Sequence, residues 1–143
     1  MRFWDSSALV PLLVIESESR AMRRLLDFDG AVAAWWGTPV ECASALARRR
    51  RAGKVSRAGE EWALAVLERL VSDWSQVAPS ESVRVQAAHL VTMHAISAAD
   101  AFQLAAATVW ADGRPRGSTL VTLDRRLAEA ARLEGFTVLP EDA

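Results

Sequence analysis

The chain has 143 residues and a formal net charge of −1, and 51% of its residues are hydrophobic. This length and composition are typical of one globular domain and exclude extensive disorder. Because the net charge is near zero, no global field attracts the protein to nucleic acid or membranes, and a polyanionic partner has to meet local positive charge. Cys42 is the only cysteine, which excludes an intrachain disulfide and favours a reducing compartment.

Two kinds of segment are not found in the sequence. The N-terminal residues lack the charged region, long apolar run and cleavage site of a signal peptide. No stretch approaches the roughly 18 consecutive apolar residues that a membrane span requires. We therefore expect a cytoplasmic protein that does not enter the membrane.

Short apolar segments alternate with helical patterns along the chain. In chain order, strands are expected over residues 2–4, 31–35, 76–78, 118–122 and 136–139. Helices are expected over residues 7–14, 17–28, 38–51, 56–74, 80–94, 97–111 and 124–134. This alternation predicts an α/β fold, in one domain over residues 1–143, with a parallel sheet covered by helices on both faces.

The sequence also predicts how some of these elements begin and pack. Thr38 before Pro39 is expected to be the N-cap of its helix. The next helix is expected to be amphipathic, and its apolar stripe comprises Trp62, Ala63, Val66, Leu67 and Leu70. Trp4 and Trp35, which end the first two strands, are expected in the core.

Four acidic residues occupy equivalent places in this pattern. Asp5 follows the first strand and Asp124 follows the fourth, whereas Glu41 and Asp100 lie in the first turns of two further helices. In an open α/β sheet the helices begin at the carboxyl ends of the strands, which is also where ligands bind. We therefore expect the four carboxylates to converge.

Helix capping is the alternative explanation for each acid taken singly. Two of the acids match the capping box, in Thr38-x-x-Glu41 and Ser97-x-x-Asp100, and the other two are suitable N-caps. Capping does not explain the apolar surroundings, which are PVECASAL and SAADAFQLAAA for the first pair. Carboxylates gathered at a buried edge repel one another, so they take up protons or bind a cation. Mg²⁺ or Mn²⁺ suits such oxygen ligands, and sites of this kind hydrolyse phosphodiesters.

Four motifs follow one another along the chain: DSSAL, TPVECASAL, ISAADAFQLAAA and TLVTLDRRLAEAA. Together, and in this order, they resemble the PIN domain, specifically the ribonuclease toxin of VapBC-type toxin–antitoxin pairs. The resemblance covers almost the whole chain. It implies a PIN-like three-layer α/β/α fold with a central parallel sheet of about five strands. It also implies a Mg²⁺ or Mn²⁺ site and endonucleolytic cleavage of RNA that leaves a 5′-phosphate and a 3′-hydroxyl.

The resemblance assigns roles to the four acids. Asp5, Glu41 and Asp100 match the three best-defined acids of the family and are expected to hold the metal and to serve catalysis. Asp124 matches the fourth and loosest acid, so its share in metal binding is expected to include a water-mediated contact. The implied mechanism is in-line attack on phosphorus by metal-activated water, with a carboxylate that assists as base.

Two small hydroxyl residues accompany these acids. Ser6 lies in the DSSAL motif, and Thr122 lies two residues before the fourth acid. The resemblance implies that both hydroxyls orient metal-bound waters. The mechanism needs no histidine, and for His89 and His94 a role in the core or at a partner is expected instead.

Basic and aromatic residues near the acids are candidate RNA contacts. Arg48 begins a run of four arginines and lies seven residues after Glu41, on nearly the same helix face and roughly 10 Å further along. Arg125 and Arg126 adjoin the fourth acid. For these arginines the alternative is a solvated surface. Trp36 is a candidate for stacking on a base, but core packing is the favoured interpretation of this residue.

The helix after the arginine run carries Trp62 and Trp74. In the resembled toxins this region, within about residues 56–75, forms a helical clip that grips the antitoxin. The implied partners are an RNA substrate and a cognate antitoxin, which covers the acidic site and alone binds operator DNA. A homodimer or a toxin–antitoxin hetero-oligomer is also implied.

A second hypothesis from a different class is a catalytically idle PIN-like domain that binds RNA or a protein. The presence of all four acids favours the nuclease, because decay of the activity usually removes one of them. Missing motifs exclude two other α/β classes. The sequence has neither the paired early acids and late lysine of a response-regulator receiver nor the G-x-G-x-x-G of a dinucleotide-binding domain.

Overall fold

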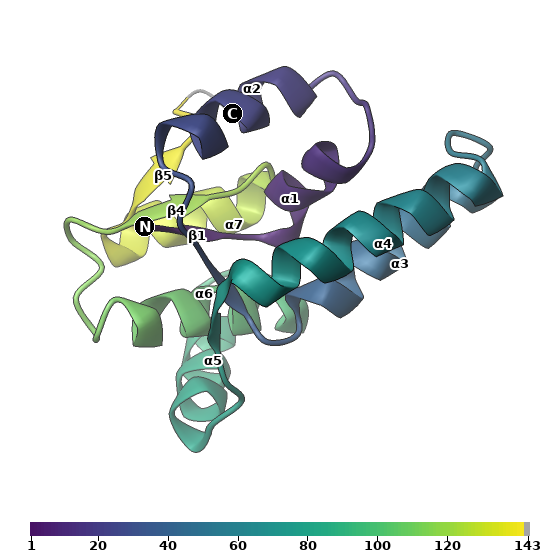
Figure 1. The fold of residues 1–143 in the computed structure, drawn as a ribbon. Helices are drawn as coiled ribbons and strands as arrows, with labels where there is room; N and C mark the ends of the chain where they lie inside the picture. Colours follow the sequence, from purple (N-terminus) through teal and green to yellow (C-terminus); the bar gives the residue numbers. More distant parts are fainter. Residues whose placement is uncertain (142–143) are drawn as a thin grey trace.

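A computed structural model describes residues 1–141 as a three-layer α/β/α domain (Figure 1). The middle layer is a parallel five-stranded sheet with the order β3-β2-β1-β4-β5. The strands are β1 (Arg2–Trp4), β2 (Val32–Trp35), β3 (Ser75–Val77), β4 (Thr119–Val121) and β5 (Thr137–Leu139). β1 is therefore the central strand, and its carboxyl end lies in the middle of the edge at which ligands bind in such sheets.

Seven helices connect and cover the strands within residues 1–141. They are α1 (Ser6–Leu13), α2 (Ser19–Phe28), α3 (Thr38–Arg51), α4 (Arg57–Asp73), α5 (Glu81–Met93), α6 (Ala98–Trp110) and α7 (Arg125–Glu134). None of them is long and apolar enough to cross a membrane. Every predicted element is present, with boundaries that differ by at most two residues, so the predicted α/β/α fold is confirmed.

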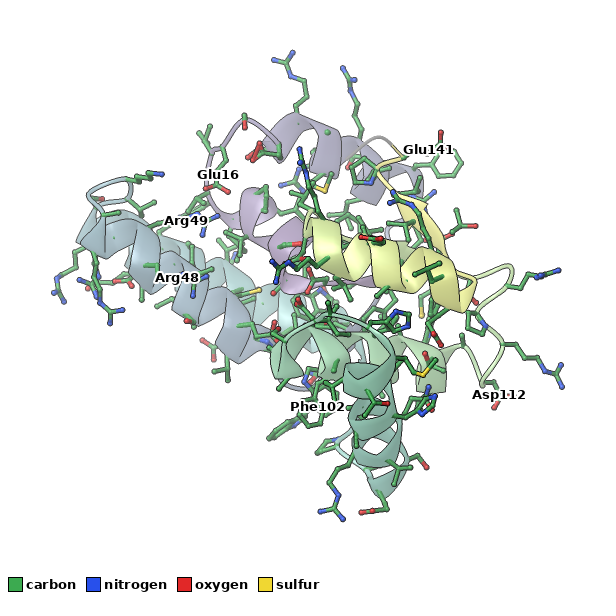
Figure 2. The ribbon with its side chains drawn as sticks, turned by 180° about the vertical axis from the view of Figure 1, so that it is seen from behind. Glu16, Arg48, Arg49, Phe102, Asp112 and Glu141 are labelled. Atoms are coloured by element: carbon green, nitrogen blue, oxygen red, sulfur yellow. The ribbon has the colours of Figure 1, made fainter. Side chains whose placement is uncertain are left out.

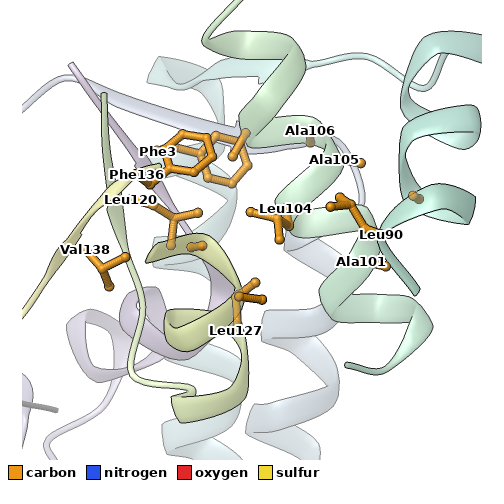
Figure 3. Close-up of a cluster of buried hydrophobic side chains, with 14 of the residues drawn as sticks. Phe3, Leu90, Ala101, Leu104, Ala105, Ala106, Leu120, Leu127, Phe136 and Val138 are labelled. Atoms are coloured by element: carbon orange, nitrogen blue, oxygen red, sulfur yellow. The ribbon is translucent and has the colours of Figure 1, made fainter. Parts of the chain in front are cut away.

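The three inner strands, β1, β2 and β4, are largely buried on both faces because their side chains alternate between two hydrophobic cores. Phe3 and Leu120 point into one core, which α5, α6 and α7 cover (Figure 3). Trp4 and Val121, the next residues along the same strands, point into the other core, which α1 to α4 cover. This alternation explains why the strands appear in the sequence as uninterrupted apolar runs.

The start of α3 differs from the prediction. Gly37 is the N-cap, and Thr38 is the first helical residue and is fully buried. A Cβ atom built on Gly37 would lie 2.6 Å from Nε1 of Trp35, so any other residue at this position would require the indole to move. The Thr38 hydroxyl does not cap α3 and is available to another element.

α3 and α4 lie side by side and extend beyond the sheet (Figure 1). An ion pair of 2.6 Å between Arg50 Nε and Glu60 Oε1 links them. The buried stripe of α4 contains Ala63 and Leu67, whereas Trp62 is 66% exposed. The prediction that Trp62 belongs to this stripe is therefore wrong. Neighbouring helix residues are rotated by about 100°, which places Trp62 on the flank of the stripe.

Candidate active site

Asp5 is a buried carboxylate at the centre of the sheet edge. Its main-chain N–H donates to the Val121 carbonyl at 3.0 Å, which ties the end of β1 to β4. Its Oδ2 accepts hydrogen bonds from Ser7 Oγ at 2.6 Å and from Thr122 Oγ1 at 2.8 Å. The same oxygen accepts from the Ser7 main-chain N–H at 3.3 Å, so Asp5 also caps α1, as the alternative reading of the sequence predicts.

Glu41 lies in the first turn of α3 and connects two other helices. Ser6 Oγ of α1 donates to Glu41 Oε1 at 3.0 Å and makes a longer contact of 3.4 Å with Asp5 Oδ1. Gln103 Nε2 of α6 donates to Glu41 Oε2 at 3.2 Å and to Thr38 Oγ1 at 2.9 Å. The capping box predicted for Thr38 and Glu41 is therefore wrong, because the carboxylate is held by residues distant in sequence.

Asp100 and Asp124 lie at the starts of α6 and α7. The main-chain N–H of Asp100 donates to Oγ of its helix cap Ser97 at 3.2 Å. Asp124 is the N-cap of α7, and its Oδ1 accepts from the Leu127 N–H at 2.9 Å. The N–H of Asp124 also donates to Thr122 Oγ1 at 3.1 Å, which connects it to the hydrogen bonds around the first acid.

The four acids line one cleft of about 650 Å³ at this edge of the sheet. They come from the end of β1 and from the starts of α3, α6 and α7. From the acids the cleft continues along α3 past Ser44 and Arg48 to Glu16, between α1 and α2. The structure thus brings together the four carboxylates that the sequence predicts to converge.

Burial and mutual repulsion raise the pKa values of three of these groups. Burial is the main cause of the raised pKa of Asp5, and hydrogen bonds from two hydroxyls oppose it. The pKa of Glu41 is raised to about 7 by burial and then by the charge of Asp5. The pKa of Asp100 is raised to about 6 by burial and then by the charges of Asp124 and Asp5. In the absence of a cation, ionisation of this cluster is unfavourable.

The donor set of the cleft consists of oxygen atoms, which suits a hard divalent cation. Cys42 lies next to Glu41 in sequence but is buried, and burial raises the pKa of its thiol to about 12. No three Asp, Glu, His or Cys side chains of the described chain are grouped so that they would hold a metal ion together. Mg²⁺ usually keeps several waters and takes only one or two carboxylates directly, so the acids fit a hydrated ion.

The predicted basic contacts lie at different distances from the cleft. Arg48 is exposed and lines it. Arg125 and Arg126 are exposed on the first turn of α7 and do not line it. Arg126 is nevertheless close enough for its positive charge to oppose the rise in the pKa of Asp100, which burial causes.

Trp36 is 58% exposed, so the interpretation that it packs in the core is wrong. Its ring packs edge-on against Trp35, with 6.4 Å between the ring centroids. Trp35 is only partly buried and stacks on Phe102 of α6 with ring centroids 5.6 Å apart. Trp36 is not among the residues that line the acidic cleft.

Both histidines lie away from the acids. His89 is exposed on α5. His94 follows the end of α5, and its Nε2 lies 2.7 Å from Glu134 Oε2 at the end of α7. Neither histidine is among the residues that line the acidic cleft.

Two side chains at the site are not anticipated by the sequence. Ser7 is expected only to start a helix, yet its hydroxyl donates to Asp5 and accepts from the Leu123 N–H at 2.8 Å. Gln103 is fully buried and holds Glu41. One signal for Gln103 exists in the sequence: it is the only polar residue in the apolar run AFQLAAA after Asp100.

Comparisons with known proteins agree with this arrangement. Residues 2–133 match the PIN domain family. Ribonuclease VapC45 of Mycobacterium tuberculosis strain CDC 1551 / Oshkosh and ribonuclease VapC49 of strain H37Rv are each 36% identical to the chain over 143 residues, which cover 96% of this chain and 94% of theirs. The crystal structure of PAE2754 from Pyrobaculum aerophilum covers 96% of this chain and 89% of its own, with a TM-score of 0.64 and 20% identity. That structure supports the fold, and the sequence matches establish that the chain belongs to the PIN domain family.

Proposed function

We propose that this chain is a Mg²⁺- or Mn²⁺-dependent endoribonuclease that cleaves RNA phosphodiester bonds and is neutralised by a cognate antitoxin. The observation that carries this proposal is the convergence of Asp5, Glu41, Asp100 and Asp124 on one cleft. The names of the M. tuberculosis relatives as ribonucleases support the choice of RNA as substrate.

The four acids would hold a hydrated cation, one or two of them directly and the others through its waters. Asp5, Glu41 and Asp100 would be its main partners, and Asp124 would act in part through a water. When bound, a divalent cation neutralises charge on a phosphate and lowers the pKa of a water molecule. Ser6 donates to Glu41, so its hydroxyl orients a carboxylate, and the same is true of Thr122 toward Asp5. We propose in addition that both hydroxyls orient waters at the ion.

Residues outside the acidic cleft are proposed to contact the RNA and the protein partner. We propose that Arg125 and Arg126 bind phosphates of the RNA and that Trp36 stacks on a base, because all three side chains are exposed near the cleft-forming helices. The exposed Trp62 on α4 supports the α3–α4 pair as the place where an antitoxin segment binds, as does its extension beyond the sheet (Figure 1). A homodimer or a toxin–antitoxin hetero-oligomer completes this proposal.

The test is cleavage of RNA by the purified protein with Mg²⁺, with Mn²⁺ and with EDTA. The same assay is repeated with Asp5→Asn and Asp100→Asn, because each change keeps the size of the side chain and removes its charge. We expect cleavage with either metal, and none with EDTA or with the variants. RNA binding without cleavage under all conditions would show instead an idle RNA-binding domain. Equal cleavage under all conditions would contradict the metal–carboxylate mechanism.

A further inference from the structure

The four consecutive arginines at the end of α3 differ in their contacts. Arg49 forms a two-point ion pair with Glu16, with distances of 2.5 Å from Nε to Oε2 and 3.2 Å from Nη2 to Oε1. Arg50 pairs with Glu60 of α4. Arg51 is the last helical residue and is exposed. Two of the four charges are therefore neutralised by carboxylates of the domain itself.

Arg48 lines the acidic cleft and has no carboxylate partner within residues 1–141. Its Nη1 donates to Ser44 Oγ at 3.0 Å, so the side chain is directed back along the helix toward its first turn. Figure 2 shows Arg48 and Arg49 next to each other on α3, with Arg49 beside Glu16. Of the two arginines that line the cleft, only Arg48 is available to an anion from outside.

The contact with Ser44 places the guanidinium of Arg48 close to the acids. Ser44 follows Glu41 by three residues, which is a rise of about 4.5 Å along the helix. Both residues line the same cleft. If one linking group of a bound polymer strand lies between the carboxylates, the adjacent linking group of that strand would therefore lie near Arg48.

The chemistry of this pair suits a phosphate. A guanidinium has five N–H donors in a planar fork, and Ser44 uses only one nitrogen of Arg48. The remaining donors match the two oxygens of a phosphodiester, and the Ser44 hydroxyl has its own proton to donate. Further along the cleft wall, Glu16 is already paired with Arg49 and Glu18 would repel the same group, so Arg48 is the cation on this wall that has no carboxylate partner within residues 1–141.

We propose that Arg48 and Ser44 form a subsite for the phosphate adjacent to the cleaved linkage of a bound RNA strand. The inference rests on the proposed function, because it assumes that RNA is the ligand of the cleft. Arg48 contacts the substrate away from the reacting atoms, so it governs binding and position rather than the chemical step.

The test compares Arg48→Gln with Arg51→Gln. Both variants lose one positive charge from the same helix, but Arg51 does not line the cleft. We expect Arg48→Gln to raise KM for a single-stranded RNA about tenfold, because a charge-assisted hydrogen bond is lost. The value of kcat stays close to that of the wild type. The slope of log KM against log salt falls by about 0.7 for Arg48→Gln only.

A second measurement identifies the phosphate. Synthetic RNAs carry a neutral methylphosphonate on one side or the other of the mapped cleavage site. One of the two substitutions is expected to raise the wild-type KM and to have no further effect on Arg48→Gln, because the missing charge and the missing guanidinium belong to one contact. Arg48→Lys is expected to fall between wild type and Arg48→Gln, since it keeps the charge and loses the fork.

The outcomes separate this inference from the function on which it rests. If wild-type protein with Mn²⁺ neither cleaves nor binds RNA, both are overturned. If wild type cleaves RNA and Arg48→Gln behaves as Arg51→Gln does, the subsite alone is overturned. It is also overturned if Arg48→Gln weakens binding of the antitoxin while KM for RNA is unchanged, since Arg48 then belongs to a protein interface.

Discussion

The Asp5 side and the Asp100 side of the cleft are built differently. Asp5 is buried and accepts hydrogen bonds from Ser7 on α1 and from Thr122 beyond β4, so it joins elements that are far apart in sequence. Asp100 is only partly buried, and its hydrogen bond to Ser97 is local to the start of α6. Asp5 therefore supports the fold as well as the cleft, whereas Asp100 makes no hydrogen bond between elements distant in sequence within residues 1–141.

The largest expected effect comes from replacing either acid with alanine. Asp5→Ala and Asp100→Ala should both reduce RNA cleavage by more than the roughly 100-fold that loss of an outer-shell partner causes. Only Asp5→Ala should also destabilise the protein, by about 2 kcal/mol, because it removes the carboxylate that accepts from the Ser7 and Thr122 hydroxyls and removes the cap of α1. Cleavage assays and thermal melts in EDTA measure the two effects. Equal losses of stability in the two variants would contradict the distinction.

Replacing Gln103 is expected to have a smaller effect on cleavage than replacing an acid. Gln103 lies on α6, as Asp100 does, and donates to Glu41 on α3. Its Nε2 donates to Glu41, but its buried Oε1 has no hydrogen-bond partner in the described part of the chain. Gln103→Met removes both the Nε2 donor to Glu41 and the Oε1 acceptor that has no partner. We expect the free energy of unfolding to change by less than about 1 kcal/mol and the Mn²⁺ concentration for half-maximal cleavage to rise about tenfold.

The control for this variant is Gln86→Met on α5, where a glutamine is replaced outside the cleft. It should leave the Mn²⁺ requirement unchanged. A Gln103→Met protein that melts several degrees lower but needs no more Mn²⁺ would assign Gln103 to the fold instead of the site.

The smallest effect is the pH dependence of stability without metal. Glu41 and Asp100 have pKa values of about 7 and about 6 in the folded protein, chiefly because of burial, against ordinary values of 4.5 and 3.8. They bind protons more tightly when folded, so their contribution to stability is complete below the ordinary values and is lost as the pH rises through 6 to 7.

In EDTA, the Tm of the wild type should therefore fall by a few degrees between about pH 5 and pH 7.5. A double variant with Glu41→Gln and Asp100→Asn should show a smaller fall over the same range. Parallel Tm profiles for the two proteins would mean that these carboxyls do not titrate in the cleft as the structure indicates.

The fold is largely predictable from the sequence because its signals are local. The strand Arg2–Trp4 and the helix caps Ser56, Ser80 and Ser97 are each specified by a few neighbouring residues. The convergence of the acids follows from one general rule, since parallel strands end at the same edge. The local capping rule fails at Thr38, which is the first residue of α3 and whose hydroxyl accepts from Gln103 of α6 instead of capping the helix.

The supporting contacts of the site could not be predicted in this way. Gln103 meets Glu41 across 62 residues, and Leu123 meets Ser7 across 116 residues. Such hydrogen bonds depend on how the helices pack on the sheet. Local sequence patterns do not predict this packing. The sequence RRRR likewise does not predict that Arg49 pairs with a carboxylate and Arg48 does not, because this difference depends on the position of Glu16 in the fold.

The central claim is that the four carboxylates together bind a divalent cation. It is tested most directly by isothermal titration of Mn²⁺ into the metal-free wild type and into Asp100→Asn at about pH 7.5, which lies above the pKa values of about 7 for Glu41 and about 6 for Asp100. We expect saturable binding to the wild type and a loss of at least about tenfold in affinity for Asp100→Asn. Identical isotherms for the two proteins, or no binding to the wild type, would contradict it.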